Sequence, residues 1–468
     1  MKITRRDREV RHLISGLLAG GAFLGLTIAT AAEPPFSIVV KDSESGRPVP
    51  LVELRTTNQV RYETDNLGVV TIDDPELLGE EVFFFVKSHG YEFPSDGFGM
   101  TGTRIKMTPG GSAELKVTRI NIAERMYRVT GGGRFVHAEK AGLEIPEFRQ
   151  GLRAGVLGCD SVLNAIYKDK LFWIWGDTNR LSYPLGNFHA TGATSELPWN
   201  PEEGIDLKYF KNGEGFVQSI AKMPGEGPTW LTGLTVLTDK DGREHLGAMY
   251  QKVKGFLELY ETGLCEFNEE TQSFEKRFAF DSGKELKHLG HPFPYRDENG
   301  KNWIVYADPL PTLKIPATYE AWLDPGQYET LKTKSNFVDE EGNQVTPHRG
   351  SIDWNEYRKR WVMIFSETKM DRKNTAPSQL GEIWYAESTS PFGPWNRCAK
   401  VLTHDRYTFY NPKQHPYFAA EGGKVIYFEG TYTATFSKAP VPTPRYDYNQ
   451  ILYRLDLGDK RLEKARTQ

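Results

Sequence analysis

The sequence predicts an all-β protein in which a small N-terminal β-sandwich is followed by a five-bladed β-propeller. Three observations predict this fold class. Apolar and polar residues alternate with a period of two in many short runs, as in half-buried strands. Turn-forming residues are plentiful, with 45 Gly and 28 Pro among 468 residues. From residue 158 onward, strongly apolar runs recur roughly every 55 to 75 residues, a spacing typical of repeated β units.

Residues 1–31 read as a signal peptide. Four arginines lie within the first eleven residues, an apolar stretch covers 13–28, and Ala29-Thr30-Ala31 supplies the small residues of a cleavage site. A membrane anchor is the alternative, but the apolar stretch is shorter than the ~20 residues that span a bilayer. No later stretch is apolar enough to span. We therefore expect a secreted or periplasmic protein with no membrane span after signal cleavage.

Charge and cysteine content exclude several classes of protein. The formal net charge is -4 and the pI about 6.3, so the chain has no basic footprint for nucleic acid. The three cysteines allow at most one disulfide, and their spacing matches no zinc motif. We expect no metal and no cofactor.

Residues 32–118 are predicted to form the separate β-sandwich. Phe36, Ile38 and Val40 alternate with polar residues, and turn clusters separate the apolar runs. Residues 119–157 form a connection to the propeller. Within it, the segment 126–135 is expected to pair with the last blade, because an open blade would leave an unpaired edge.

The sandwich segment contains "KDSESGRPVP", "TDNLG" and "VKSHGY". Through these motifs it resembles the carboxypeptidase regulatory-like (transthyretin-like) domain family over about 80 residues. The resemblance implies a binding or spacing module without chemistry of its own.

Residues 158–468 are predicted to form the propeller. Strand, tight polar turn and strongly apolar second strand recur five times, and several of the turns are hairpin signals. The expected second strands are 171–175, 246–250, 303–306, 361–365 and 425–428. A large two-sheet sandwich is the alternative, but five well-spaced hairpins favour blades of four strands each.

Polar residues at the expected inner strands indicate a site on the propeller axis. Core packing would place Val or Ile there. The residues expected to converge are Asp160, His291, Arg349 and His415, and the ring of Tyr410 could stack on a sugar. His291, His348 and His415 could instead gather a transition metal, although each lies beside a proline, which indicates a local backbone role.

A second group of acids follows the second strands, namely Asp177, Asp308 and Glu367, with Glu429 displaced by one residue. Such acids often cap strand ends. Asp177 differs because it lies in Trp173-Ile174-Trp175-Gly176-Asp177-Thr178-Asn179-Arg180. We predict that Trp175, Asn179 and Arg180 bind substrate beside it, although Trp175 could equally belong to the core.

The segments "GCDSV", "WIWGDTNR", "GEIWYAESTSPFGPW", "YNPKQHPYF" and "PRYDYNQILYRLDL" resemble bacterial five-bladed propellers related to glycoside hydrolases. The resemblance covers about 300 residues. It is greatest to the endo-D-arabinanase-like group and more distant to glycoside hydrolase family 43. It implies that Asp160 and Asp177 are catalytic carboxylates. Family 43 also has a Glu acid on the third inner strand, and residues 290–294 here contain none.

Hydrolysis of a glycosidic bond needs one protonated and one ionised carboxyl, so the candidate catalytic residues are Asp160, Asp177 and Asp308. We therefore expect a glycoside hydrolase-like propeller that acts on a polysaccharide or oligosaccharide. Two alternatives remain open. One is a carbohydrate- or surface-binding propeller without catalysis. The other is a polysaccharide lyase that uses Arg349, His291 and Tyr410.

Overall fold

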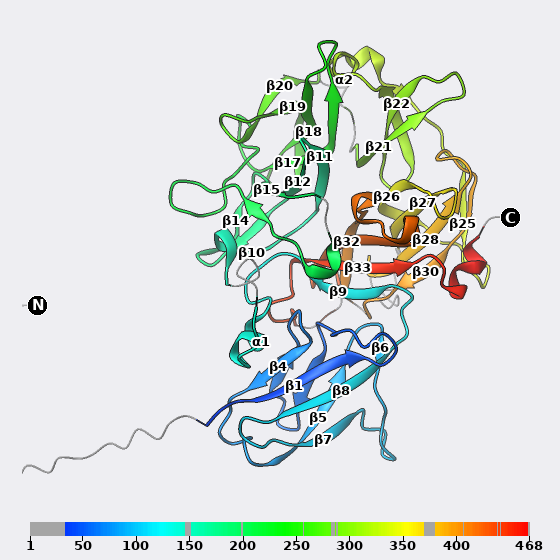
Figure 1. Cartoon of the computed structure of the whole chain (residues 1–468). Helices are drawn as coiled ribbons and strands as arrows, with labels where there is room; N and C mark the ends of the chain where they lie inside the picture. Colours follow the sequence, from blue (N-terminus) through cyan, green and yellow to red (C-terminus); the bar gives the residue numbers. More distant parts are fainter. Residues whose placement is uncertain are drawn as a thin grey trace, which may run out of the picture.

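The computed structural model describes residues 33–466, with gaps at 146–150, 198–199, 256, 282–285, 287–288, 369–379, 406, 438 and 440. The predicted all-β fold is confirmed, with a small β domain below a larger propeller-like body in Figure 1. The expected signal peptide lies outside the described residues. Within the described part of the chain, no helix has the length and apolar character needed to cross a membrane.

The N-terminal domain consists of two four-stranded sheets, ordered β4-β1-β8-β6 and β3-β2-β5-β7. The two sheets share one apolar core, to which Phe36, Ile38 and Val40 of β1 contribute as the alternation predicts. The strands are β1 (Phe36–Asp42), β2 (Glu53–Thr56), β3 (Arg61–Glu63), β4 (Val69–Ile72), β5 (Glu81–Lys87), β6 (Tyr91–Glu92), β7 (Gly102–Lys106) and β8 (Ser112–Arg119).

Five four-stranded antiparallel sheets follow along the chain. The first three contain β11 (Leu163–Tyr167), β12 (Lys170–Trp175), β15 (Thr191–Ser195) and β16 (Lys208–Tyr209); β17 (Thr229–Thr238), β18 (Glu244–Lys254), β19 (Glu258–Asn268) and β20 (Ser273–Ala279); and β21 (His291–Arg296), β22 (Asn302–Ala307), β23 (Pro311–Pro316) and β24 (Glu329–Thr330). The last two contain β26 (Pro347–Asn355), β27 (Arg360–Glu367), β28 (Ile383–Ser388) and β30 (Ala399–Leu402); and β31 (Thr408–Gln414), β32 (Val425–Thr433), β33 (Asn449–Asp456) and β9 (Glu124–Arg128). All five segments expected to be second strands lie in the second strand of a sheet, namely β12, β18, β22, β27 and β32.

Shorter elements lie between these sheets. A three-stranded sheet contains β10 (Val156–Cys159), β13 (Thr178–Arg180) and β14 (Tyr183–Asn187), and β25 (Ser335–Val338) pairs with β29 (Trp395–Arg397). The α-helices of the described residues are α1 (Val136–Lys140) and α2 (Tyr319–Leu323). Gly158 and Cys159, at the start of the predicted propeller, belong to β10, and the first four-stranded sheet begins with β11.

The fifth sheet takes its fourth strand from far upstream. β9 pairs antiparallel with β33, with Arg128 opposite Ile451 and Tyr127 opposite Leu452. The two strands lie side by side in Figure 1, cyan beside red. Of the segment 126–135 that was expected to pair there, only its first three residues are in the strand. The outer edge of β33 is therefore covered.

One buried arginine joins the N-terminal domain to the fifth sheet. Arg125 on β9 is 2% exposed. Its guanidinium donates hydrogen bonds to the carbonyls of Pro50 (2.9 Å) and His89 (2.6 Å) in the N-terminal domain and to the hydroxyl of Tyr453 (3.2 Å) in β33. A single side chain thus satisfies polar groups on both sides of the junction, which fixes their relative position.

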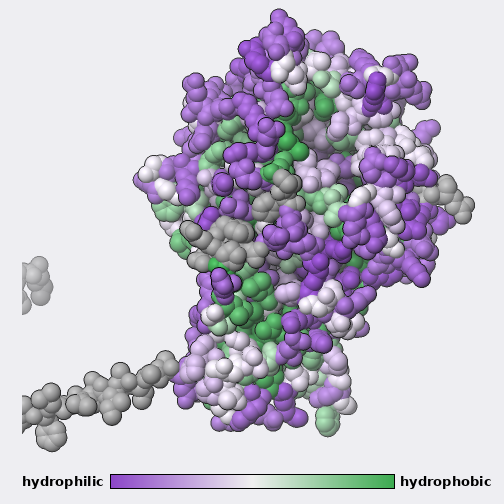
Figure 2. Space-filling model, in the orientation of Figure 1, coloured by the Kyte–Doolittle hydropathy of each residue, from purple (hydrophilic) through white to green (hydrophobic). Residues whose placement is uncertain are grey.

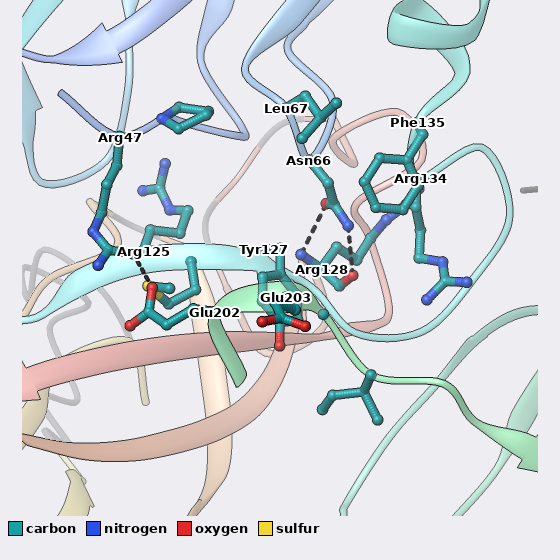
Figure 3. Close-up of a pocket in the computed structure, with 14 residues that line it drawn as sticks. Arg47, Asn66, Leu67, Arg125, Tyr127, Arg128, Arg134, Phe135, Glu202 and Glu203 are labelled. Atoms are coloured by element: carbon teal, nitrogen blue, oxygen red, sulfur yellow. Dashed lines mark hydrogen bonds and ion pairs between the residues drawn. The ribbon is translucent and has the colours of Figure 1, made fainter. Parts of the chain in front are cut away.

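A second set of contacts surrounds a junction cavity of about 110 Å³. Figure 3 shows the Asn66 amide paired with the backbone of Arg128, donating to its carbonyl (2.9 Å) and accepting from its N–H (3.0 Å). Across the same cavity, Arg47 forms an ion pair with Glu202. Figure 2 shows hydrophobic residues gathered on the N-terminal domain next to the propeller. Polar and apolar contacts together hold the domain in place.

Candidate active site

Two strand ends bring Asp160 and Asp177 together. Asp160 follows β10, and Asp177 lies between β12 and β13. The backbone N–H of Asp160 donates to the carbonyl of Asp177 (3.3 Å), and the N–H of Gly176 donates to the carbonyl of Asp160 (2.8 Å). The two acids are therefore neighbours at the open end of the hairpin that β11 and β12 form.

Gly176 makes room for the Asp160 carboxyl. A Cβ at position 176 would lie 2.2 Å from Asp160 Oδ1, far inside contact distance. Asp160 therefore lies directly over the Gly176 backbone. The glycine between Trp175 and Asp177 is required by this close approach.

Phenol hydroxyls hold Asp160. Tyr410 donates from its hydroxyl to Asp160 Oδ2 at 2.6 Å, and Tyr448 and Ser161 also hydrogen-bond the carboxyl. Burial raises the pKa of Asp160, and these hydrogen bonds oppose the rise because they favour the ionised form. Asp160 therefore has more hydrogen-bond partners than Asp177 has.

Asp177 has fewer stabilising contacts. The indole Nε1–H of Trp230 donates to Asp177 Oδ1 at 3.3 Å. Burial, followed by the negative charge of Asp160, raises the pKa of Asp177 to about 7. Arg180 does not neutralise the pair: its Nη2 donates instead to the carbonyl of Val217 (2.7 Å). Two carboxyls in unequal environments divide into one that holds a proton and one that does not.

The backbone around the pair is strained. Three residues here have positive φ values, in the left-handed region that residues other than glycine rarely adopt. They are Ser161 (55°), Asn411 (51°) and Tyr448 (59°). They are linked to one another and to the site, because Asn411 Nδ2 donates to Ser161 Oγ (2.7 Å) and Tyr448 bonds Asp160. Strained residues of this kind gather at functional sites, where the surrounding structure holds them.

Asp308, the third candidate carboxylate, contacts Arg349 and Gly350. It follows β22 and forms an ion pair with Arg349, and the N–H of Gly350 donates to Asp308 Oδ1 at 3.1 Å. Arg349 thus lies at the start of β26 as predicted, but its guanidinium pairs with Asp308. His291 at the start of β21 is 8% exposed. Burial, followed by the charge of Arg349, lowers the pKa of the neighbouring His348.

Two of the predicted substrate-binding residues are in the core, so those predictions are wrong. Trp175 is fully buried and stacks on Trp173, with ring centroids 5.8 Å apart and planes 7° apart. His415 is 1% exposed, and its Nδ1 lies 2.9 Å from the Asn164 amide. Both faces of β12 are covered, so period-two alternation could not assign Trp175 to one side.

His415 directly follows β31, and its ring lies in the core beside Asn164. Among the described residues there is no group of three His, Cys, Asp or Glu side chains arranged to hold a metal ion. Asn179 is also occupied locally, because its Oδ1 accepts from the N–H of Leu185 (2.6 Å) and fixes the β13–β14 hairpin.

Sequence reasoning missed the role of Tyr448 altogether. This residue lies 288 positions after Asp160, so no local pattern connects the two. The only available signal was the "PRYDYNQ" segment before the last strand, where two tyrosines flank an acid in a turn.

Comparison with known proteins gives only distant similarities. No family model and no curated protein matches the sequence. Among solved structures, the chain is similar to an exo-β-1,3-galactanase from Phanerochaete chrysosporium solved with galactose (10% identity, 72% of this chain and 65% of that chain, TM-score 0.40). It is also similar to an exo-1,5-α-L-arabinanase from a bovine ruminal metagenomic library (11% identity, 65% and 95%, TM-score 0.37). At these identities and TM-scores, the activity has to be inferred from the residues of this chain.

Proposed function

We propose that the protein is a glycoside hydrolase-like propeller that cleaves a polysaccharide or oligosaccharide by carboxylate acid/base catalysis. The observation that carries the proposal is the Asp160–Asp177 pair, two neighbouring partly buried carboxyls with unequal hydrogen-bonding partners. The five consecutive sheets would be the blades of one propeller, with the pair at its mouth.

The environments assign a role to each acid. Asp177, with its pKa raised to about 7, holds a proton and delivers it to the leaving glycosidic oxygen. Burial raises the pKa of Asp160, but the hydrogen bonds from Tyr410 and Tyr448 favour its ionised form, and in that form Asp160 activates water or attacks the anomeric carbon. Trp230 lies half-buried beside Asp177 and presents an aromatic ring on which a sugar can pack.

The test is hydrolysis of a panel of plant, algal and bacterial polysaccharides, followed by measurement of released reducing ends. We expect Asp160→Asn and Asp177→Asn each to lower the rate by about 100- to 10,000-fold without changing the melting temperature by more than a few degrees. Glu298→Gln, at an exposed turn, is the matched control and should retain full activity. Equal activity in all three variants would contradict the assignment.

The two alternatives differ in their support. A lyase would need Arg349 and Tyr410 to face a uronate, but Arg349 is paired with Asp308 and Tyr410 with Asp160. A binding protein without catalysis is favoured by the absence of a Glu at 290–294. Binding of a polysaccharide by the wild-type protein without release of any reducing ends would establish that alternative.

We also propose that the protein is exported. The basic and then apolar character of residues 1–31 supports this, and cleavage after Ala31 would leave a mature chain that begins near the N-terminal domain. The mass of the N-terminal peptide from secreted or periplasmic material tests it. Recovery of an intact Met1 peptide from the cytoplasm would contradict it.

A further inference from the structure

A cleft of about 490 Å³ lies between the N-terminal domain and the fifth sheet. Small-molecule sites occur preferentially at such domain boundaries and span ~300–1,000 Å³. The cleft is much larger than the junction cavity in Figure 3. Its walls come from two parts of the chain. One wall contains Glu53, Arg61 and Glu63 of the N-terminal domain, and the other Asp405, Tyr432 and Val441.

Hydrogen bonds fix the position of the two walls of the cleft relative to each other. His89 Nε2 lies 2.8 Å from the Tyr432 hydroxyl and links the two walls directly. The Ser88 hydroxyl donates to the carbonyl of Leu51 (3.0 Å), and Arg125 donates to both Ser88 and Leu51. The walls are therefore fixed before any ligand arrives, which lowers the entropic cost of binding.

The wall of the N-terminal domain carries a row of opposite charges. Arg61 Nη2 lies 2.9 Å from Glu53 Oε2 and 3.0 Å from Glu63 Oε1. Glu53 and Glu63 are directly opposite each other on β2 and β3, so their side chains share a face. The Arg61 and Glu53 side chains remain 32% and 23% exposed, and the Glu63 side chain 8%. This row offers hydrogen-bond donors and acceptors in alternation.

The wall of the propeller adds one acid and an apolar rim. Asp405 Oδ2 lies 3.8 Å from Lys87 Nζ across the cleft, and both side chains are more than half exposed. Val441 is 56% exposed at the edge. Tyr407 and Tyr432 stack on each other behind it, with ring centroids 4.0 Å apart.

We propose that this cleft binds a second segment of a neutral carbohydrate chain, a proposal that rests on the proposed function. Sugar hydroxyls both donate and accept, which matches the alternating Glu53, Arg61 and Glu63. Among the residues that line the cleft, three carboxylates face Arg61 and Lys87, and burial lowers the pKa of His89. Arg55 lies 3.4 Å from Glu53, so the charges balance and the cleft does not favour a polyanion. An extended peptide would instead need a free strand edge or a deep apolar groove.

The cleft and the candidate active site border the same segment of chain. Between β32 and β33, Phe436 contacts Tyr410, whose hydroxyl holds Asp160, while Val441 and Thr443 line the cleft. Phe436 and Val441 of one segment of chain therefore contact the candidate active site and the cleft, respectively. The N-terminal domain, expected to have no site of its own, contributes one wall.

The test measures retention of the Asp160→Asn protein in gels that contain arabinan, galactan, xylan or polygalacturonate, because this background leaves the chain uncut. We expect retention by at least one neutral polysaccharide. Adding Arg61→Met or Glu53→Gln should weaken it by about tenfold, since each removes a hydrogen bond to a charged group. Arg104→Met, exposed on β7 of the same domain, is the matched control and should bind normally.

Three outcomes would overturn the proposal: equal retention of all variants, retention by polygalacturonate alone, or no retention by any polysaccharide. A melting curve of each variant shows whether it is folded. If Arg61→Met is not folded, Glu53→Gln still provides the test, because it keeps the shape of the side chain. Failure of the proposed function would give a different result. A wild-type protein that releases no reducing ends, while its cleft variants still lose binding, contradicts the catalytic proposal and leaves the cleft intact.

Discussion

At the scale of single residues, the two carboxyls should be visible in the pH dependence of the reaction. In the proposed mechanism Asp177 acts as an acid only while protonated, so kcat/KM should fall as the pH rises through about 7. Asp160 acts only while ionised, so kcat/KM should fall as the pH drops through its own pKa. A bell-shaped profile with its alkaline limb near pH 7 is expected. An alkaline limb that is absent, or that survives Asp177→Asn unchanged, would reassign the acid.

The phenol of Tyr410 should set the other limb. Tyr410→Phe removes a hydrogen bond that favours the ionised form of Asp160, so the pKa of Asp160 rises. The acidic limb should move upward by about one pH unit, since a hydrogen bond to a charged group is worth about 1.5–3 kcal/mol and one pKa unit about 1.4 kcal/mol. An unmoved acidic limb in Tyr410→Phe would show that Asp160 is not the group observed.

Gly176 offers a steric test of the same carboxyl. Gly176→Ala places a methyl group 2.2 Å from the present position of Asp160 Oδ1, so the carboxyl must move. A displacement of about 1 Å costs about 100-fold in rate when geometry matters. Gly213→Ala, where an added Cβ meets nothing within 4 Å, is the matched control. Full activity in Gly176→Ala would mean that the position of Asp160 is unimportant.

At the scale of elements, the second sheet positions Trp230 through a buried lysine. Lys252 on β18 is fully buried, and its Nζ donates to the carbonyls of Met223, Gly225 and Gly227 in the segment that leads into β17. β17 carries Trp230 to Asp177. A single ammonium group thus orders the approach to the site.

Lys252→Met should therefore affect both stability and the site. Loss of these hydrogen bonds leaves buried carbonyls unpaired, and the free energy of unfolding should fall by about 1–3 kcal/mol. Trp230 should become more mobile, which tryptophan fluorescence anisotropy detects, and kcat should fall with it. The exposed Lys240→Met is the control. Lower stability with unchanged fluorescence and kcat would limit Lys252 to a structural role.

At the scale of the whole molecule, Arg125 joins the two parts. Arg125→Met leaves the carbonyls of Pro50 and His89 without their donor, so the free energy of unfolding should fall by about 1–3 kcal/mol. Limited proteolysis should then cut between the N-terminal domain and β9, and Arg104→Met should resist as the wild type does. A variant that resists equally would show that apolar contacts alone hold the junction.

The sequence predicted the sheets better than the site. Tight turns and apolar second strands are local signals, so all five hairpins could be placed from them. The burial of Trp175 and His415 could not be predicted, because it depends on the side chains of neighbouring sheets. The contact of Tyr448 with Asp160 joins residues 288 positions apart. Asp177 could be predicted from the sequence, because a Gly and an acid follow two tryptophans in one short segment.

The pairing of β9 with β33 also bears on how the chain folds as it is made. The N-terminal domain is complete once β8 has emerged, and it can fold first on the ribosome or after transport. β9 follows at once but must wait for its partner, because Arg128 and Ile451 are separated by more than 300 residues of chain. Contacts of such long range form slowly. The last strand to be synthesised therefore decides when the ring closes, and a chain interrupted before residue 449 would expose the edges of both β9 and β32.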